Sequence, residues 1–243
     1  MTKTLTPADI DQLVSQWLKI GPITGIKTLK AAQEIGGKMS IRNSKMPGST
    51  FPTSTTRCVT GLKLAEIPNS VCSECYATRL ENLRPNVAAG WLNNSIKTMR
   101  TLATDPDQWV DASVYQINHY YKRTGQHYHR WFDSGDLENK AELHAIAQVA
   151  VATPKFNHWL PTKEIKLLRA YLKQNTLPDN LAVRASSPMI DQKPLRGFRN
   201  TSTVHRDSDP VGYSCPAKYQ GHSCGTCRAC WEPAVANVSY PKH

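Results

Sequence analysis

The amino-acid sequence predicts an α/β fold: βα units on an open parallel sheet or in a partial barrel, with a helical N-terminal part and an irregular cysteine-rich C-terminal tail. Apolar runs at 128–133, 156–160 and 180–185 have the length of buried strands. Segments with helical periodicity separate these runs, and this alternation is typical of right-handed βα units. Four of the seven cysteines lie within residues 215–230. Hydrophobic residues make up 40% of the 243 residues, which excludes a wholly disordered chain.

Helices are expected at the start of the chain. Thr6-Pro7 offers an N-cap and a proline at the first helical position, and apolar residues at helical spacing then predict a helix over 7–19. A second helical pattern covers 28–35 and ends at Gly36-Gly37. Residues 43–56 are rich in turn formers and lack periodicity, so we expect a structured loop there.

Further helices precede and separate the strands. Periodicity predicts them over 72–83, 87–103, 106–122, 138–152 and 164–174. We therefore divide the chain into three parts. These are a helical segment at 1–38, an α/β core with the first cysteine set at 39–200, and a cysteine-rich metal-binding tail at 201–243.

Composition narrows the class of protein. The formal net charge is +11, but the basic residues are spread along the chain, so the charge permits an anionic partner without locating one. Nucleic acid is one such partner, with Trp91–Arg100 or Lys193–Arg206 as the footprint. No apolar run reaches the roughly 18 residues of a membrane span, and the N-terminus lacks the apolar core of a secretory signal. We expect a cytoplasmic protein without a membrane partner.

The odd number of cysteines argues against a complete set of disulfides, and clustered cysteines in a reducing compartment usually bind metal. In the tail, Cys224, Cys227 and Cys230 follow one another at two-residue spacing, and Cys215 is followed by proline. Three equally spaced cysteines with a fourth nearby suit the corners of a 4Fe-4S cluster. Zinc held by four thiolates is the alternative for this tail site.

The other three cysteines are Cys58, Cys72 and Cys75. A set of three thiolates leaves one corner of a 4Fe-4S cluster open, and an open corner can bind a small molecule such as S-adenosylmethionine. Two other interpretations stay open. A tail cysteine could close this cluster, or the three could be structural residues without a metal.

Polar residues follow each predicted strand, where an α/β sheet usually binds its ligand. They are Ser134, Asp136, Thr162, Lys163, Arg184 and Ser186. We expect these residues to contact a small-molecule ligand. The alternatives are helix-capping turns for the aspartates and a surface ion pair for Arg184. His127 and His129 share one face of a strand, where packed imidazoles are favoured over a two-histidine metal site.

Four segments together resemble the bacteriophage gene product 88 domain family. They are Asn43-Ser-Lys-Met46, Cys72-x-x-Cys75-Tyr76-Ala77, Arg130-Trp-Phe-Asp-Ser-Gly-Asp136 and Cys224-x-x-Cys227-x-x-Cys230-Trp231. The resemblance runs from residue 43 to 231 and implies a viral origin, and hence a location in the host cytoplasm.

The order of a cysteine triple followed by βα units is also similar to that of radical S-adenosylmethionine enzymes, whose partial barrels carry a three-cysteine cluster. Their triple is usually Cys-x-x-x-Cys-x-x-Cys, whereas thirteen residues separate Cys58 from Cys72 here. Their aromatic residue precedes the last cysteine, but Tyr76 follows it here. This similarity is therefore an analogy of arrangement.

Two classes of function follow from these patterns. The first is an iron-sulfur protein of bacteriophage type with one or two 4Fe-4S clusters, in which an open-site cluster activates S-adenosylmethionine for radical chemistry and an electron donor reduces it. The second is a non-enzymatic iron-sulfur or zinc protein that binds nucleic acid or carries electrons. The sequence has no P-loop, no dinucleotide fingerprint and no nucleophile elbow, so phosphoryl transfer, dinucleotide binding and hydrolase chemistry lose support.

Overall fold

A computed structural model describes residues 25–41 and 44–242 of the chain. The helix predicted over 7–19 lies outside the described residues. The helix predicted over 28–35 is present as α2 (Leu29–Gly36), where the Thr28 side chain accepts a hydrogen bond from the backbone N–H of Ala31.

A parallel sheet of seven strands forms the centre of the described structure, in the order β1-β2-β3-β4-β5-β7-β6. The strands are β1 (Ser49–Phe51), β2 (Tyr128–Trp131), β3 (Asn157–Thr162), β4 (Leu181–Ile190), β5 (Thr201–His205), β6 (Tyr213–Ser214) and β7 (Asn237–Pro241). Every neighbouring pair is parallel, and β1 and β6 are the two edges. The predicted α/β class is confirmed, and of the two predicted forms the open sheet is the one observed.

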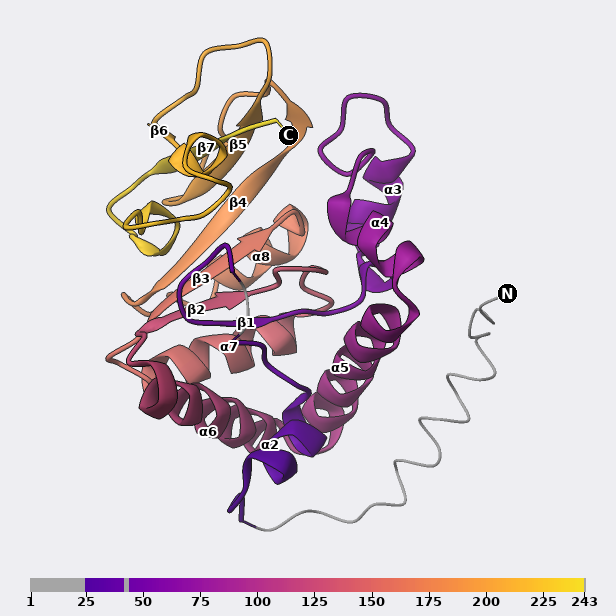
Figure 1. The fold of residues 1–243 in the computed structure, drawn as a ribbon, viewed down its shortest axis with the longest axis vertical. Coiled ribbons are helices and arrows are strands. Elements are labelled where there is room, and N and C mark those ends of the chain that lie inside the picture. Colours follow the sequence, from indigo (N-terminus) through magenta and orange to yellow (C-terminus); the bar gives the residue numbers. More distant parts are fainter. Residues whose placement is uncertain (1–24, 42–43, 243) are drawn as a thin grey trace.

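Seven α-helices accompany this sheet within the described residues. After α2 they are α3 (Val59–Ala65), α4 (Tyr76–Leu83), α5 (Pro85–Thr104), α6 (Pro106–Thr124), α7 (Lys140–Ala152) and α8 (Ile165–Leu172). In Figure 1, α6 and α7 lie below the strands, α3 and α4 stand above α5, and the tail, in light orange to yellow, contains β5, β6 and β7 at the upper left. Among the described residues, no helix is both long enough and apolar enough to cross a membrane.

Local sequence signals set the ends of the connecting helices. Asp105 caps α6 by accepting a hydrogen bond from Gln108 N–H, Pro106 takes the first position, and Gly125 ends the helix in the left-handed conformation. Asn139 caps α7 in the same way, through the backbone N–H of Glu142. The Glu142 carboxylate accepts in turn from the backbone N–H of Glu138, the residue before this N-cap.

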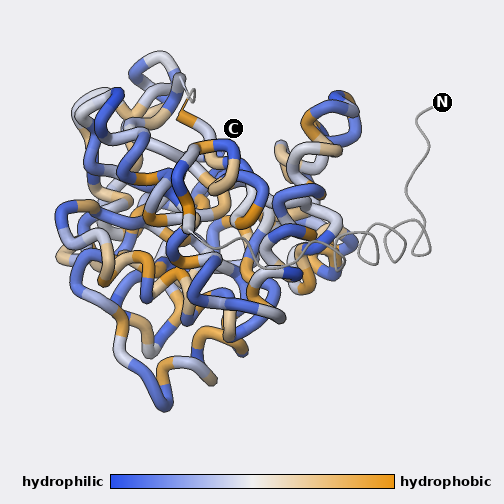
Figure 2. The backbone as a smooth tube through the Cα atoms, turned by 90° about the horizontal axis from the view of Figure 1, so that it is seen from below, coloured by the Kyte–Doolittle hydropathy of each residue, from blue (hydrophilic) through white to orange (hydrophobic). Residues whose placement is uncertain are grey.

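The sheet separates two apolar clusters. On the helix-covered face, Trp131 and Leu160 are fully buried with Trp109 of α6, in the main core. His129 and His158 also lie on this face with no exposed surface, and burial lowers the pKa of both imidazoles. His129 is therefore a packed histidine. In Figure 2, hydrophobic stretches of the chain gather toward the middle and hydrophilic stretches follow the outside.

The opposite face of the sheet is covered by the cysteine-rich tail. Trp231 packs edge-on against Trp159 of β3 and Tyr128 of β2, with ring centroids 5.1 and 5.5 Å apart. Its indole N–H donates to the backbone carbonyl of His129 at 2.9 Å. The tail therefore takes the place that helices occupy on the other face.

Arg184 of β4 fixes the tail to the sheet. Its side chain has no exposed surface and donates to five backbone carbonyls. The acceptors are Ala229, Cys230, Glu232, Val235 and Thr201, at 2.7 to 3.3 Å. Because these five acceptors satisfy a fully buried cation, four of them between residues 229 and 235, the guanidinium specifies the path of that segment.

Several elements differ from the sequence expectations. The chain expected to form a loop at 43–56 contains β1, and α3 was not predicted. The helix expected from Cys72 begins only at Tyr76. The tail was expected to be irregular, but it supplies β5, β6 and β7 to the same sheet.

The strand predicted to end at Ala185 continues to Ile190. Arg184 and Ser186 are therefore within a strand rather than at its end. The strand boundary predicted at Ala185 is therefore wrong. The extra residues have partners instead: Pro188 carbonyl accepts from Val71 N–H, and Ile190 N–H donates to Asn69 carbonyl.

We expect Arg184→Met to destabilise the fold by ~3–5 kcal/mol, because it removes five charge-assisted hydrogen bonds that join β4 to the tail. Urea unfolding followed by circular dichroism measures this change. Arg196→Met is the matched control, because Arg196 is exposed, and it should change the free energy of unfolding by less than about 0.5 kcal/mol. Equal unfolding midpoints for the two variants would contradict the role of Arg184.

A pH dependence follows from Glu142. Burial, and then the neighbouring carboxylates of Glu138 and Asp136, raise its pKa to about 8, although the Glu138 N–H opposes the shift. Since the pKa in the unfolded chain is about 4.3, ionisation costs the folded state stability as the pH rises from about 4 to about 8. Glu142→Gln removes this cost and keeps an acceptor for the N–H.

The stability of Glu142→Gln relative to the unmodified protein should therefore increase between pH 5 and pH 8 and then level off. Melting temperatures at each pH measure it, with Glu66→Gln as the control, since Glu66 is exposed. Parallel curves of melting temperature against pH for Glu142→Gln and the unmodified protein would contradict a raised pKa of Glu142.

Candidate functional site

We call Cys58, Cys72 and Cys75 the front cysteines or front set. Two of them begin helices. Cys58 is the N-cap residue of α3 and Cys75 is the N-cap residue of α4, and their backbone carbonyls accept from Leu62 and Arg79. Neither side chain caps its helix, so both sulfur atoms are free for another partner. Cys72 lies in the turn before α4.

The structure brings these three cysteines together. A Cβ placed on Gly61 would lie 3.7 Å from the sulfur of Cys58 and 3.8 Å from the sulfur of Cys72. Burial raises the pKa of the Cys58 thiol, and negative charges on Cys75 and Cys72 raise it further. Burial is also the main cause of the raised pKa of Cys72. Cys58 and Cys72 therefore lie side by side at Gly61, and Cys75 is near enough to act on both electrostatically.

The strand-end residues of β2 and β3 meet beside these cysteines. The buried Asp136 carboxylate accepts from Thr162 Oγ1 at 2.6 Å, from Lys163 N–H at 2.8 Å and from Leu137 N–H at 2.8 Å. Burial raises its pKa to about 6, although these hydrogen bonds and the charge of Lys163 lower it. Asp136, Thr162 and Lys163 were predicted as ligand residues from topology, and the structure places them in contact with one another.

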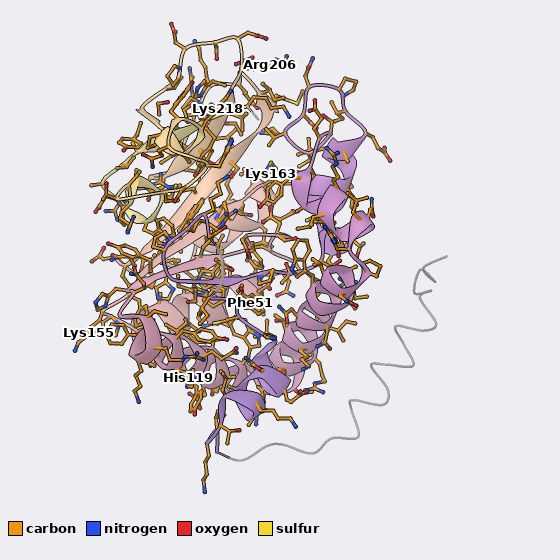
Figure 3. All side chains as sticks on the ribbon, in the orientation of Figure 1. Phe51, His119, Lys155, Lys163, Arg206 and Lys218 are labelled. Atoms are coloured by element: carbon orange, nitrogen blue, oxygen red, sulfur yellow. The ribbon has the colours of Figure 1, made fainter. Side chains whose placement is uncertain are left out.

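Lys163 connects this group to the thiols. Its positive charge lowers the pKa of both Cys58 and Cys72, and the negative charge of Asp136 raises both. In Figure 3 the labelled Lys163 lies on the flank of the sheet that faces α3 and α4. A cation and a carboxylate therefore stand next to the three-cysteine set.

Gly135 explains the tight turn after β2. Its φ is +82°, and a Cβ there would lie 1.9 Å from Thr53 Oγ1. The neighbouring Ser134 is 3% exposed, and its carbonyl accepts from Thr53 N–H. The Ser134 hydroxyl has no hydrogen-bond partner among the described residues. Of the predicted residues in this turn, Asp136 contacts the neighbouring strand end, and Ser134 is buried beneath it.

Two buried glutamates, which sequence reasoning missed, position the front cysteines. Glu164 accepts from Thr60 N–H and Thr60 Oγ1, both at 2.7 Å, and so ties the first turn of α3 to the end of β3. Glu81 of α4 accepts from Ser54 Oγ at 2.6 Å and from Thr55 N–H at 2.9 Å. These partners are 26 to 104 residues apart in sequence, so no local pattern signals them.

β4 holds the third front cysteine. The backbone of Asn69 and Val71 pairs with the end of this strand, through Ile190 N–H and Pro188 carbonyl. An antiparallel bridge joins Ser70 to Met189. Cys72 follows this paired segment directly. The extension of β4 beyond its predicted end therefore has a function in placing the front set.

The four tail cysteines also lie together, on the face opposite the helices. Cys230 is 7% exposed and belongs to the apolar cluster of Trp159, Trp231 and Val238. The partly buried Cys215, Cys224 and Cys227 pack against the same cluster.

Burial is the first cause of the raised pKa in three tail thiols. It raises the pKa of Cys230 to about 12, and it also raises the pKa of Cys215 and Cys224. Negative charges on Cys215 and Cys227 would raise the Cys224 pKa further, whereas Lys45 and Arg130 lower it. The tail set is therefore an electrostatically coupled group with cations beside it.

Three contacts position the tail cysteines. Arg184 Nε donates to the Cys230 carbonyl at 2.9 Å, and Trp231 is anchored to β2. Cys224 N–H donates to the Lys45 carbonyl at 2.7 Å. The tail is thus attached at both ends of its cysteine triple. Arg184, predicted as a ligand residue, acts here as a structural support, and Ser186 Oγ bonds Ser202 Oγ at 2.9 Å.

Arg130 of β2 lies between the two cysteine sets. Its guanidinium stacks over the Trp159 ring at 4.4 Å from the centroid, and its Nη1 lies 3.2 Å from Met46 Sδ. Its charge lowers the pKa of Cys224 and Cys230, and it also acts on Tyr76, which follows Cys75.

All seven cysteines are free thiols. Within residues 25–41 and 44–242, no three His, Cys, Asp or Glu side chains stand at the separations of a preformed site for a single metal ion.

The segments predicted as a nucleic-acid footprint contain basic residues with local partners. Lys97 is largely buried and pairs with Glu34 at 2.8 Å. Arg206 pairs with the adjacent Asp207 at 3.0 Å. Both basic side chains are therefore engaged within the chain.

Comparison with known proteins gives one match. The family model described as "Gene product 88" matches residues 23–233, which include both cysteine sets and all strands from β1 to β6. No curated protein and no solved structure shows significant similarity to the chain. Since the match covers most of the sequence, the chain belongs to the gene product 88 family.

Proposed function

We propose that this protein is a bacteriophage iron-sulfur protein with a 4Fe-4S cluster held by Cys215, Cys224, Cys227 and Cys230. The observation that carries the proposal is the packing of these four thiols as one group on one face of the sheet. Thiolates are the ligands of iron-sulfur clusters, and the spacing of the last three suits neighbouring cluster corners. The phage-type family supports the viral setting.

The surroundings of the tail set fit an anionic cluster. Four thiolates carry more negative charge than the iron–sulfide core of a cubane offsets, so nearby cations favour the bound state. Arg130, Arg184 and Lys45 supply such charge, because each lowers the pKa of a tail thiol. A cubane separates its ligands further than a single ion does, so these thiols need not approach as closely as in a zinc site.

The front set is proposed to hold a second cluster with one corner free of cysteine. Cys58, Cys72 and Cys75 would supply the three ligands, and Gly61 leaves space beside two of them. Asp136 and Lys163 provide opposite charges next to this position. These charges complement the amino and carboxylate groups of S-adenosylmethionine, which is the small molecule proposed to bind there.

A bound cluster supplies one-electron transfer and, at an open corner, reductive activation of S-adenosylmethionine. The chain's own residues have separate roles. The cysteines bind iron, Asp136 and Lys163 orient the ligand, and Glu81 and Glu164 hold the two helices that carry Cys58 and Cys75. Electron carriage by the tail cluster alone is the alternative function.

Metal analysis of cysteine variants tests the proposal. The unmodified protein, purified without oxygen, should contain about eight iron atoms per chain. The triple variant Cys224→Ser/Cys227→Ser/Cys230→Ser should lose the tail iron and keep about four atoms, and so should Cys58→Ser/Cys72→Ser/Cys75→Ser for the front set.

Each triple variant serves as the control for the other. Stoichiometric zinc without iron in the unmodified protein would overturn the proposal. If only the tail triple lowers the iron content, the protein has one cluster and the electron-carrier function is favoured.

A glycine substitution tests the front site without removing a ligand. Gly61→Leu should exclude the front cluster, because even a Cβ at residue 61 would lie 2.9 Å from Cys58 Cβ. Gly90→Leu is the matched control, since no atom lies within 4 Å of a Cβ there.

Adding S-adenosylmethionine should change the electron paramagnetic resonance spectrum of the reduced unmodified protein and of Gly90→Leu. It should leave the spectrum of Gly61→Leu unchanged. No spectral change in any of the three proteins would contradict binding at an open cluster corner.

A further inference from the structure

Two tyrosine hydroxyl groups reach the sulfur atoms of the tail set. Tyr240 of β7 places its hydroxyl 3.2 Å from Cys230 Sγ, and Tyr213 of β6 places its hydroxyl 3.4 Å from Cys227 Sγ. Neither tyrosine belongs to the motifs that relate the chain to its family, and Tyr240 lies beyond residue 233, the end of the family match. Their contacts with the sulfur atoms are therefore a property of this fold that the cysteine pattern does not signal.

The direction of each hydrogen bond follows from the ligand chemistry. A cysteine that ligates iron is a thiolate and has no proton to donate. The tyrosine hydroxyl must then be the donor and the sulfur the acceptor. A hydrogen bond to a ligand sulfur stabilises the more negative state of a cluster, which is the reduced state.

The two tyrosines differ in their surroundings. Tyr240 packs against the apolar cluster around Trp231, next to a sulfur of a cysteine that is 7% exposed. Arg184 also donates to the backbone carbonyl of that cysteine, Cys230. Tyr213 is 42% exposed, so water competes for its hydroxyl and screens its effect.

We infer that Tyr240 tunes the tail site, by donating a hydrogen bond to the Cys230 sulfur that raises the reduction potential of a cluster bound there. Tyr213 donates to the Cys227 sulfur and raises the potential by a smaller amount. The inference rests on the proposed function, since it requires a cluster in the tail. It adds that β6 and β7, the last strands of the sheet, are part of the electronic environment of the site.

Three tyrosine-to-phenylalanine variants test the inference in the full chain, purified without oxygen. Tyr240→Phe and Tyr213→Phe each remove one hydroxyl and keep the ring, and Tyr219→Phe is the control because that side chain is 77% exposed. Redox titration followed by electron paramagnetic resonance measures the midpoint potential of the tail cluster. To isolate that cluster, each variant is also prepared in the Cys58→Ser/Cys72→Ser/Cys75→Ser background.

The midpoint potential should fall most in Tyr240→Phe, less in Tyr213→Phe, and not at all in Tyr219→Phe. A complementary substitution retains the donor: fluorinated tyrosine at position 240 is a stronger hydrogen-bond donor and should raise the potential. The two opposite shifts at one position would support the inference even if the phenylalanine variant binds less iron.

An iron-loaded tail whose potential is the same with tyrosine, phenylalanine and fluorinated tyrosine at position 240 would overturn the inference and leave the proposed function intact. A tail without iron in the otherwise unmodified protein would overturn the proposed function itself. The iron content and the potential therefore separate the two failures.

Discussion

The buried guanidinium of Arg184 is the interaction on which the arrangement of the tail depends. It stands in a central strand, makes no ion pair with any described residue, and donates to five carbonyl oxygens of the tail, one of them in β5. An arginine can bind several carbonyls at once because its planar guanidinium holds five N–H donors in fixed directions. The lysine side chain ends in one compact ammonium group instead. Four of the five carbonyls belong to residues 229–235, and one is that of Cys230 itself. The tail cysteines are thus held to the sheet by polar contacts beneath them and by Trp231 beside them.

β4 connects this interaction to the front set of cysteines. Its middle carries Arg184 under the tail, and its end pairs with the segment that leads into Cys72. The neighbouring strands contribute Asp136, Thr162 and Lys163 at their carboxyl ends, and Glu164 just beyond ties down α3. Both thiol sets therefore contact the same sheet, although they come from distant parts of the sequence. Arg130 lies between the two sets, and its charge lowers the pKa of Cys224 in the tail set and of Tyr76 next to the front set.

The sequence was sufficient for the parts of the fold that have regular periodicity. The βα units around β2, β3 and β4, and the convergence of Asp136 with Thr162 and Lys163, follow from apolar runs and from the geometry of parallel strands. The strands of the tail were missed because β5 and β6 are short and polar, so neither apolar alternation nor length distinguishes them from a loop. The third strand was predicted to end at Ala185, but Ser186-Ser187-Pro188 stays extended through pairing with β5 and with residues 69–71, which the local sequence does not signal. Glu81, Glu164 and Tyr240 act through partners whose relation to them appears only after folding.

Anomalous diffraction from crystals grown without oxygen would test most directly the claim that the two thiol sets hold iron-sulfur clusters. Data collected on either side of the iron absorption edge should give a strong difference peak among Cys215, Cys224, Cys227 and Cys230, and a second among Cys58, Cys72 and Cys75. Cluster-sized density at both peaks is the result that this account predicts. A single compact peak that appears only at the zinc edge, or no peak at either set of thiols, would contradict it.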